Sequence, residues 1–406
     1  MSRTILCIGA MDTKGEEYAY VSELIEKRGH KILVMDTGIW SESIAPDSIP
    51  SAQVAEAGGS SLEHLRKQAD RGTAMEIMRA GVRQLVPALY SQGRFQGILG
   101  LGGGAGTSIA TAAMRTLPVG VPKLMVSTLA SSNVHAFVAL KDITMMHSVV
   151  DIAGLNRISK PILANAAGAI CGMVESELAA VSDRPAIAAT MFGVTTPCVE
   201  LIRKHMEAAG FECIVFHATG TGGRTMETLI EDGFFTAVAD ITTTEWCDEV
   251  VGGVLPGGPD RFGAAGRNAI PQVVSCGALD MVNFHALNTV PEHFRQRTLY
   301  RHNADVTLMR TRPDECQAIA SRMAESLNRA RGPVTFLMPL QGVSMLDKKG
   351  EPFYDPDANR VLFETFRQEL SPSIRIVEAD MHINDPGFAQ LVSQQLLSAL
   401  TPNGAT

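Results

Sequence analysis

Short runs of apolar residues alternate with longer stretches in which apolar positions recur at helical spacing. Nearly all-apolar runs of about four to eight residues are typical of strands in parallel sheets that are covered on both faces. Thr4–Ile8 and Lys31–Asp36 show this pattern. Between them, Glu16–Arg28 has an apolar face at helical spacing and is followed by Gly29, which favours a helix end there. The chain therefore begins as a strand–helix–strand unit.

Strand and helix patterns continue to alternate and form two successive series. In the first series, further strands are expected at Gly97–Leu101 and Lys123–Ser127, and helices at Thr107–Leu117 and Ile158–Val174. A polar stretch that ends in Asp183-Arg184-Pro185 then predicts a boundary between an N-terminal domain, residues 1–182, and a C-terminal domain, residues 183–401.

The second series repeats the same order of elements. A helix is expected over Pro197–Ala209, with Thr196 as N-cap, and another over Thr225–Asp232. Strands are expected at Ala186–Met191, Phe211–Phe216, Phe235–Asp240, Gln272–Cys276, Val306–Met309, Val334–Pro339 and Ile374–Val377. The predicted fold class is α/β, with two doubly wound, Rossmann-like domains whose sheets are mainly parallel.

Composition excludes several classes of partner. The chain has 406 residues and a net charge of −8, and it has no cluster of Lys and Arg, which argues against a nucleic-acid partner. No apolar stretch reaches the roughly 18 residues that a membrane span needs, so no membrane partner is expected. Seven scattered cysteines without a CxxC pair are typical of buried apolar residues in a reducing compartment, which predicts a cytoplasmic protein.

A glycine-rich run after the Gly97–Leu101 strand is the strongest local signal in the first domain. Open parallel sheets bind ligands beyond the carboxyl ends of their strands, and glycine lets backbone N–H groups approach an anion. Lys14 can neutralise a phosphate, Asp12 can hold Mg²⁺ or a hydroxyl, and Asp36 ends a strand where a ribose-binding acid often lies. A tight turn that needs small residues is the alternative. The predicted cofactor contacts are Asp12, Thr13, Lys14, Asp36, Gly102, Gly103, Gly104, Gly106, Thr107 and Ser127.

Six strand ends of the second domain carry small, hydroxyl, His or acidic residues, which suggests the rim of one cleft. His217 is a candidate general base, and Glu245 and Asp280 can orient it or bind a metal, although a structural histidine and ordinary turns explain the same residues. These three form the predicted catalytic group, and no dedicated metal motif accompanies them. Arg224 can bind an anion bidentately. The predicted substrate contacts are Thr196, Thr219, Gly220, Gly222, Gly223, Arg224 and Thr243.

Several longer blocks together resemble the Tm-one-like ATP-binding family over nearly the whole chain. The blocks are Ile8–Lys14, Gly100–Ser108, Thr190–Val199, Phe216–Glu227, Asp240–Glu245 and Gly277–Phe284. The resemblance implies that ATP, with or without Mg²⁺, is the cofactor, that Asp12–Lys14 and Gly102–Thr107 contact it, and that the chain forms a homodimer or a higher homo-oligomer. Plant members have Ser-Gly-Gly in place of Gly104-Ala105-Gly106, a change that keeps the loop small.

Three functions stay open at this point. The first is an ATP-binding protein that acts on or senses a small anionic metabolite, by acid–base or ATP-dependent chemistry if it is an enzyme. The second is a metabolic enzyme that holds NAD(P) or a phosphosugar in the same glycine-rich site. The third is a regulatory module that binds a nucleotide and catalyses nothing.

Overall fold

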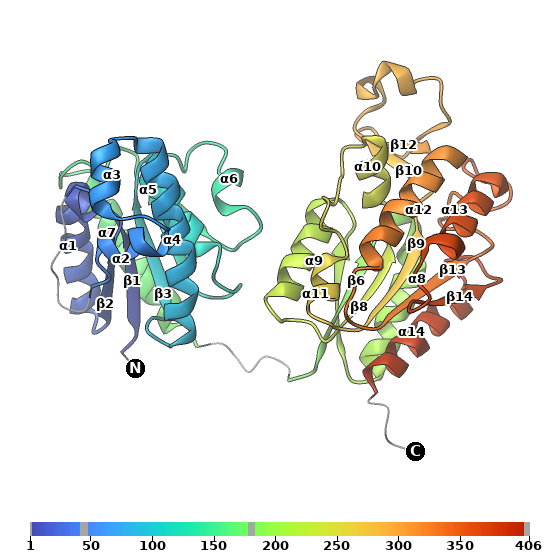
Figure 1. The fold of residues 1–406 in the computed structure, drawn as a ribbon, viewed down its shortest axis with the longest axis horizontal. Coiled ribbons are helices and arrows are strands. Elements are labelled where there is room, and N and C mark those ends of the chain that lie inside the picture. Colours follow the sequence, from blue (N-terminus) through green and yellow to red (C-terminus); the bar gives the residue numbers. More distant parts are fainter. Residues whose placement is uncertain (1, 41–47, 178–182, 402–406) are drawn as a thin grey trace. The chain divides into compact units, whose positions relative to one another are not determined.

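The chain folds into two compact units, residues 1–181 and 182–406 (Figure 1). The computed structural model describes residues 2–40, 48–177 and 183–401. The boundary predicted between residues 182 and 183 falls next to segment 178–182, which lies outside the described residues. Each unit is built around its own sheet and has its own apolar core.

The N-terminal unit contains a five-stranded, fully parallel sheet with the order β2-β1-β3-β4-β5. β1 pairs with β2 on one side and with β3 on the other, so the chain reverses its direction of progress across the sheet at β1. The strands are β1 (Thr4–Gly9), β2 (Lys31–Asp36), β3 (Gly97–Gly102), β4 (Lys123–Ser127) and β5 (Thr144–His147). The carboxyl ends of the neighbouring strands β1 and β3 therefore mark the topological switch point, beyond which such sheets bind ligands.

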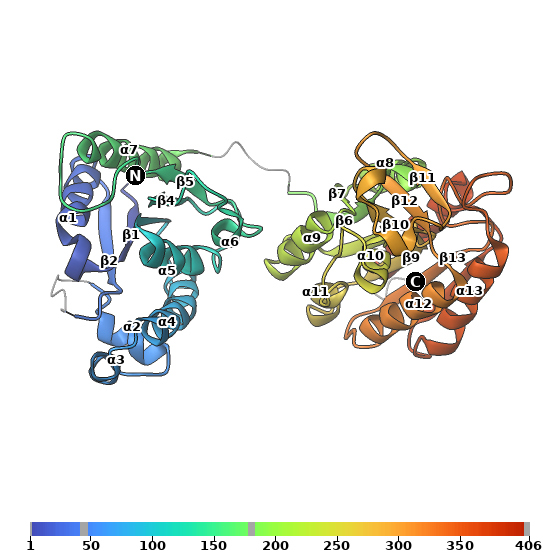
Figure 2. The same cartoon turned by 90° about the horizontal axis from the view of Figure 1, so that it is seen from above.

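Helices cover both faces of this sheet (Figure 2). Successive side chains of a strand point to opposite faces. Ile5 and Cys7 therefore pack with α1 and α7, whereas Leu6 and Ile8 pack with α2, α3, α4 and α5. The helices are α1 (Met11–Lys27), α2 (Ser51–Ala57), α3 (Leu62–Gln68), α4 (Arg71–Ser91), α5 (Gly104–Met114), α6 (His135–Val138) and α7 (Ser159–Glu175).

The C-terminal unit has a six-stranded parallel sheet with the order β14-β13-β9-β8-β6-β7. Its switch point lies between β6 and β8. From β6 the chain adds β7 on one side, and it then adds β8, β9, β13 and β14 on the other side. The strands are β6 (Ala186–Met191), β7 (Glu212–His217), β8 (Ala237–Thr242), β9 (Gln272–Gly277), β13 (Val334–Pro339) and β14 (Arg375–Ala379). Two mainly parallel, doubly wound sheets confirm the predicted fold class.

A small antiparallel sheet, β10-β12-β11, corrects one prediction. The strand expected at Val306–Met309 forms, but as β12 (Thr307–Arg310) between β10 (Met281–Phe284) and β11 (Leu299–Arg301), and not in the main sheet. An apolar run indicates a strand without indicating which neighbour it pairs with, because pairing depends on the path of the chain.

Helices of the C-terminal unit also cover both faces of its sheet. α8 and α14 pack on one face, and α9, α11, α12 and α13 pack on the other. The helices are α8 (Thr196–Ala208), α9 (Thr221–Glu231), α10 (Glu245–Val251), α11 (Gly263–Arg267), α12 (Pro313–Leu327), α13 (Pro356–Glu369) and α14 (Pro386–Leu400), with short 3-10 turns η1 (Gly193–Thr195), η2 (Leu287–Thr289) and η3 (Glu292–Phe294).

Four helices begin earlier than the sequence predicts, and the largest difference is at α1, which begins at Met11 instead of Glu16. α8 has Thr195 as its N-cap instead of Thr196, α5 begins at Gly104 instead of Thr107, and α9 begins at Thr221 instead of Thr225. Glycine and threonine have low helix propensity, so their presence hides the first turn of a helix from sequence analysis. The correction matters because it places the glycine N–H groups inside first turns, where they have no helical acceptor.

All seven cysteines are buried with free thiols, as their sequence context predicts. Burial raises the pKa of Cys7 and Cys198 to about 12, so these thiols stay protonated. Within the described ranges, no helix combines the length and the apolar character that crossing a bilayer requires.

Candidate functional site

The switch point of the N-terminal unit carries a cavity of about 350 Å³. Its walls come from the turn between β1 and α1, the segment after β2, the α3–α4 corner and the start of α5. The lining residues are Ala10, Asp12, Thr13, Thr37, Gly38, Ile39, Trp40, Leu65, Ala69, Asp70, Arg71, Ala74, Met75, Met78, Ala105, Gly106 and Ile109. Most of these side chains are apolar, and Trp40 is 63% exposed.

A second cavity of about 300 Å³ adjoins the first and is more polar in character. The two share Ala10, Thr13, Arg71, Ala105 and Gly106, so they form one continuous cleft. The other lining residues of the second cavity are Lys14, Leu101, Gly102, Gly103, Gly104 and Asp151. The cleft therefore has an apolar part and a part built from glycine backbone and charged side chains, and its size is in the range of small-ligand sites.

Backbone N–H groups from the first turn of α5 line this cleft. The first intrahelical bond runs from the Thr107 N–H to the Gly103 carbonyl at 2.8 Å. The N–H groups of Gly104, Ala105 and Gly106 therefore precede any helical acceptor and stand at the positive end of the helix dipole. A Cβ on Gly102 would lie 2.9 Å from the Gly106 Cα, so the close approach of β3 to α5 requires glycine.

Two cations and two carboxylates surround these amides. Lys14 interrupts α1 with φ −129° and ψ 17°, and its Nζ contacts the Ile152 carbonyl. Arg71, in the first turn of α4, lines both cavities and is exposed. Asp12 accepts a hydrogen bond from the Trp40 N–H at 3.0 Å, and Asp151 lines the polar cavity. The cleft thus offers positive charge and free N–H donors to an anion.

Seven of the ten predicted cofactor contacts line the cleft: Asp12, Thr13, Lys14, Gly102, Gly103, Gly104 and Gly106. The other three lie behind its wall and are fully buried. Asp36 accepts hydrogen bonds from the N–H groups of Met11 and Gly38 at 2.9 and 2.8 Å, and so fixes the β1–α1 turn instead of facing a ribose. The hydroxyls of Thr107 and Ser127 pair with each other at 2.7 Å and join α5 to β4.

Arg71, Trp40, Asp151 and the apolar wall of the cleft were not predicted from the sequence. Asp70 caps α4 through the N–H groups of Gly72 and Thr73, which is a recognisable helix-start signal. Nothing in the local sequence, however, indicates that this helix start lies beside β1. The long connection from β2 to β3 brings it there, and only the tertiary fold determines that path.

The switch point of the C-terminal unit is filled by its own side chains. Thr190, Thr195 and Thr242 are fully buried where β6 and β8 end. The hydroxyls of Thr195 and Thr242 are 2.7 Å apart, and the Thr242 N–H donates to the Thr190 hydroxyl at 3.0 Å. The predicted substrate contact Thr243 is also fully buried, and its hydroxyl donates to the Ser275 carbonyl.

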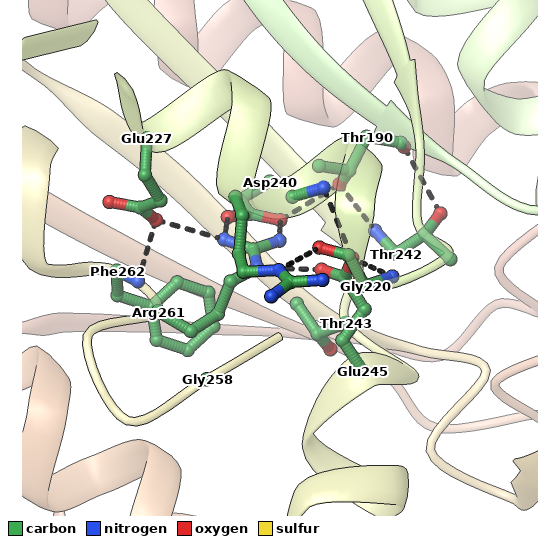
Figure 3. Close-up of polar contacts among 12 residues, drawn as sticks. Thr190, Gly220, Glu227, Asp240, Thr242, Thr243, Glu245, Gly258, Arg261 and Phe262 are labelled. Atoms are coloured by element: carbon green, nitrogen blue, oxygen red, sulfur yellow. Dashed lines mark hydrogen bonds and ion pairs between the residues drawn. The ribbon is translucent and has the colours of Figure 1, made fainter. Parts of the chain in front are cut away.

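The first turn of α9 already holds an anion, the carboxylate of Glu245 (Figure 3). One oxygen of Glu245 accepts the N–H groups of Gly220 and Gly223 at 2.6 and 3.1 Å. The predicted substrate-binding loop is therefore satisfied from within the protein. Gly222 is required for packing, because a Cβ there would stand 1.8 Å from the His217 carbonyl oxygen.

Arg261 is the centre of this buried network and was not predicted from the sequence (Figure 3). Its Nε donates to the second oxygen of Glu245 at 2.7 Å, and its Nη2 donates to Asp240 at 2.7 Å. Glu227 accepts a weaker bond from Nη1 at 3.2 Å. Burial disfavours the charged form of Arg261, but attraction to the three carboxylates outweighs it and raises the pKa. The network is thus an internal, charge-paired support.

His217, Glu245 and Asp280 do not meet as the predicted catalytic group. His217 is exposed at the end of the edge strand β7 and packs edge-on against Phe192, with ring centroids 5.3 Å apart. Glu245 and Asp280 are fully buried, and no hydrogen bond or ion pair among the described residues joins either one to His217. Neither carboxylate orients His217: Glu245 binds Gly220 and Arg261, and Asp280 binds Ser344.

The remaining predicted substrate contacts are taken up by local structure. Arg224 is exposed, and its Nε donates to the Gly220 carbonyl at 3.2 Å. The Thr196 hydroxyl donates to the Phe192 carbonyl at 3.2 Å, and the Thr219 N–H donates to the His217 carbonyl at 2.8 Å. These contacts are those of turns and helix starts, which is the alternative that the sequence left open.

Asp280 lies in a second buried cluster of the C-terminal unit. Its Oδ2 accepts the Ser344 hydroxyl at 2.7 Å, whereas its Oδ1 has no hydrogen-bond partner. Asp347, also fully buried, has one unbonded oxygen that lies 3.8 Å from Nη2 of Arg310. Burial, followed by repulsion from Asp347, raises the pKa of Asp280 to about 7. No group of three or more potential metal ligands occurs in the described parts of the chain.

Comparison with known proteins gives a match over nearly the whole chain. Residues 3–179 match the N-terminal domain of the uncharacterised protein family UPF0261, and residues 184–400 match its C-terminal domain. A UPF0261 protein of Clostridium tetani is 48% identical over 402 residues, 98% of this chain and 100% of that protein. The ToMV resistance protein Tm-1(GCR237) of Solanum lycopersicum is 38% identical over 98% of this chain and 56% of its own length.

Solved structures give a weaker likeness. MurG of Acinetobacter baumannii aligns over 99% of this chain and 96% of its own, at 11% identity and a TM-score of 0.22. Such a score supports no conclusion about function.

Proposed function

This chain belongs to the uncharacterised protein family UPF0261, and we propose that its N-terminal unit binds ATP in the cleft at the β1/β3 switch point. The observation that carries the proposal is the first turn of α5, whose three amides without helical acceptors line the cleft together with Lys14 and Arg71. Amides at a helix start, combined with cationic side chains, are the usual receptor for phosphate oxygens.

The two parts of the cleft suit the two ends of a nucleotide. We assign the phosphates to the polar cavity around Gly103 and Lys14, and the adenine to the apolar cavity beside Trp40. An exposed indole offers an aromatic face for stacking, and buried apolar side chains exclude water from the rest of the base. Magnesium usually binds through one or two carboxylates plus substrate phosphates. Asp12, Asp70 and Asp151 line the cleft, and because Asp70 caps α4, we assign this role to Asp12 and Asp151.

Fluorescence of Trp40 provides a direct test, because the chain has two tryptophans and the other does not line the cleft. Trp246 is 2% exposed in the core of the C-terminal unit. In a Trp246→Phe chain, titration with ATP and Mg²⁺ should change the Trp40 emission to saturation. The Trp40→Phe chain should show no change with the same titration. Absence of a saturable signal, together with absence of heat in calorimetry, would rule out ATP binding.

Substitution of the two cations tests which groups hold the phosphates. Lys14→Ala and Arg71→Ala should each weaken ATP binding by about tenfold or more, because a hydrogen bond to a charged group contributes roughly 1.5–3 kcal/mol. Lys27→Ala, at the far end of α1, and Arg83→Ala, on the exposed side of α4, are matched controls and should bind like the wild type. Equal affinities in all four variants would refute the assignment of the phosphate site.

Competition distinguishes ATP from the other candidate ligands. NAD, NADP and a sugar phosphate should each displace ATP from the Trp40 site weakly or not at all if ATP is the natural ligand. Tighter binding of NAD(P) or of a sugar phosphate would favour the metabolic-enzyme alternative. Release of ADP and phosphate would indicate turnover, whereas tight binding without turnover would favour a regulatory module.

The cellular setting completes the proposal. We propose a cytoplasmic protein, because seven buried free thiols are typical of a reducing compartment. Assembly into a homodimer or a higher homo-oligomer is also proposed, and light scattering of the full chain with and without ATP tests it. A small anionic metabolite remains the proposed second ligand, but the α9 loop expected to bind it is already occupied by Glu245.

A further inference from the structure

A third cavity lies within the C-terminal unit, at the carboxyl end of β13. It has a volume of about 230 Å³, which is below the usual range of small-ligand sites and has room only for a very small ligand. The segment that follows β13 and one face of α13, from its first turn to its last, form most of it. Its lining residues are Leu340, Gln341, Tyr354, Pro356, Asn359, Arg360, Phe363 and Arg367. The carboxyl end of a parallel strand is the edge of the sheet where ligands bind.

The lining is rich in hydrogen-bond donors, and carboxylates just outside it contact some of them: Asp357 lies 3.8 Å from Arg360, and Gln341 donates to Asp380. The lining includes two guanidinium groups, from Arg360 and Arg367, and the amide and phenol groups of Gln341 and Tyr354, whereas no Asp or Glu lines the cavity. Phe363, which lies between the two arginines on α13, supplies an apolar wall. We propose that this cavity binds a small anion with two or more negative oxygens, either a dicarboxylate or a phosphate. This proposal does not depend on ATP binding in the other unit.

Both arginines are held in place but keep donors for a ligand. Arg367 is bound bidentately by Glu378, with N–O distances of 2.7 and 3.1 Å, and Arg360 is bound by Glu364 at 3.1 Å. A guanidinium has five N–H donors, so each arginine can bind its glutamate and still contact an anion. The side chain of Arg367 is 39% exposed and that of Arg360 is 58% exposed, so both can contact a ligand without leaving a buried position.

The floor of the cavity is rigid. Asn359 is 7% exposed, its Nδ2 donates to Asp347 at 2.7 Å, and its Oδ1 accepts Nη2 of Arg310 at 2.9 Å. Arg310 is itself buried and donates to the Phe353 carbonyl at 2.7 Å. The cavity thus rests on the buried cluster that contains Asp280, and fixed groups beneath a site reduce the entropy lost when a ligand binds.

Titration of the full chain with succinate and, separately, with inorganic phosphate tests the proposal. Calorimetry should detect at least one of them with a Kd of about 1 mM or tighter. The double variant Arg360→Gln/Arg367→Gln should weaken that binding by about tenfold or more. The control is Arg322→Gln on the neighbouring helix α12, where a 53% exposed arginine pairs with Glu325 at 2.6 Å outside the cavity. This control should bind like the wild type.

The two probes and one further variant give distinct outcomes. Binding of succinate alone identifies a dicarboxylate site, and binding of phosphate alone identifies a phosphate site. Phosphate can also enter the N-terminal cleft, so Lys14→Ala is titrated in parallel and should leave the binding at α13 unchanged. The proposal is overturned if neither probe binds at about 10 mM, or if Lys14→Ala abolishes binding that the double arginine variant retains.

Discussion

Two glycine-rich helix starts, α5 in the N-terminal unit and α9 in the C-terminal unit, have opposite surroundings. The amides of Gly104, Ala105 and Gly106 line an open cleft, whereas those of Gly220 and Gly223 bind the carboxylate of Glu245. A helix N-terminus favours negative charge, and of these two starts α9 receives it from a carboxylate of the same unit. The comparison teaches that a glycine run specifies an anion receptor without specifying whether the anion is a ligand or part of the protein.

The two units also distribute charge differently. The cleft of the N-terminal unit is lined by Lys14 and Arg71, whereas the C-terminal unit buries Arg261 among three carboxylates. A buried ion pair stabilises a fold weakly on balance, but removal of one partner is costly, because it leaves an uncompensated charge in the interior. Stability measurements can therefore separate the self-contained network from the open site.

Arg261→Met should have the largest effect. It leaves Asp240 and Glu245 buried without their cation, so the free energy of unfolding should fall by about 3–5 kcal/mol. Urea denaturation in a Trp40→Phe chain follows the C-terminal unit through Trp246, which packs against Phe262. Arg322→Met removes an exposed ion pair on α12 and should cost less than about 1 kcal/mol. Equal losses in the two variants would contradict the central role of Arg261.

Asp280→Asn should alter the pH dependence of stability. The pKa of Asp280 is raised to about 7 in the fold, so its contribution to stability is fully present below about pH 4 and is lost as pH rises to about 7. Relative to wild type, the variant should gain about 2–3 kcal/mol between pH 5 and pH 8, measured by urea denaturation of Trp246 emission.

A second buried aspartate of the same unit, Asp248, provides the control for this measurement. Asp347 and Arg310 keep their places beside residue 280 in the variant, and Asp248, whose pKa burial also raises to about 7, still titrates. Asp248→Asn should therefore show its own pH-dependent gain in the same unit. Parallel stability–pH curves for Asp280→Asn and wild type would contradict the expected titration of Asp280.

Gly223→Ala and Gly106→Ala compare the third residue of the two helices directly. A Cβ on Gly223 would lie 2.1 Å from a Glu245 oxygen and displace the carboxylate, which should cost about 1–3 kcal/mol in the Trp246 transition. At Gly106 the nearest atom, the Leu101 carbonyl oxygen, is 3.3 Å away. The helix propensity of alanine offsets that contact, so a change within about 1 kcal/mol is expected. A larger loss at Gly106 would show that the open start is as tightly packed as the closed one.

Much of the architecture could be predicted because strand and helix periodicity is a local property. The strands at Lys31–Asp36, Lys123–Ser127, Ala186–Met191 and Val334–Pro339 have the expected bounds. Of the predicted family, membership alone is shown, by the matches to both UPF0261 domains and to the tomato protein Tm-1(GCR237), whereas ATP binding stays a proposal. The antiparallel placement of Thr307–Arg310 was not predictable, since partner choice depends on distant segments such as Met281–Phe284.

The candidate site divides in the same way. Glycines, Lys14 and Asp12 follow apolar strands directly, so the sequence was enough to predict that they lie together beyond β1 and β3. That Arg71 and Trp40 join this cleft, and that Glu245 and Arg261 close the other loop, depends on the tertiary fold. The physical reason is that propensity and backbone geometry act between near neighbours, whereas charge pairing and burial join residues that only the folded path of the chain brings together.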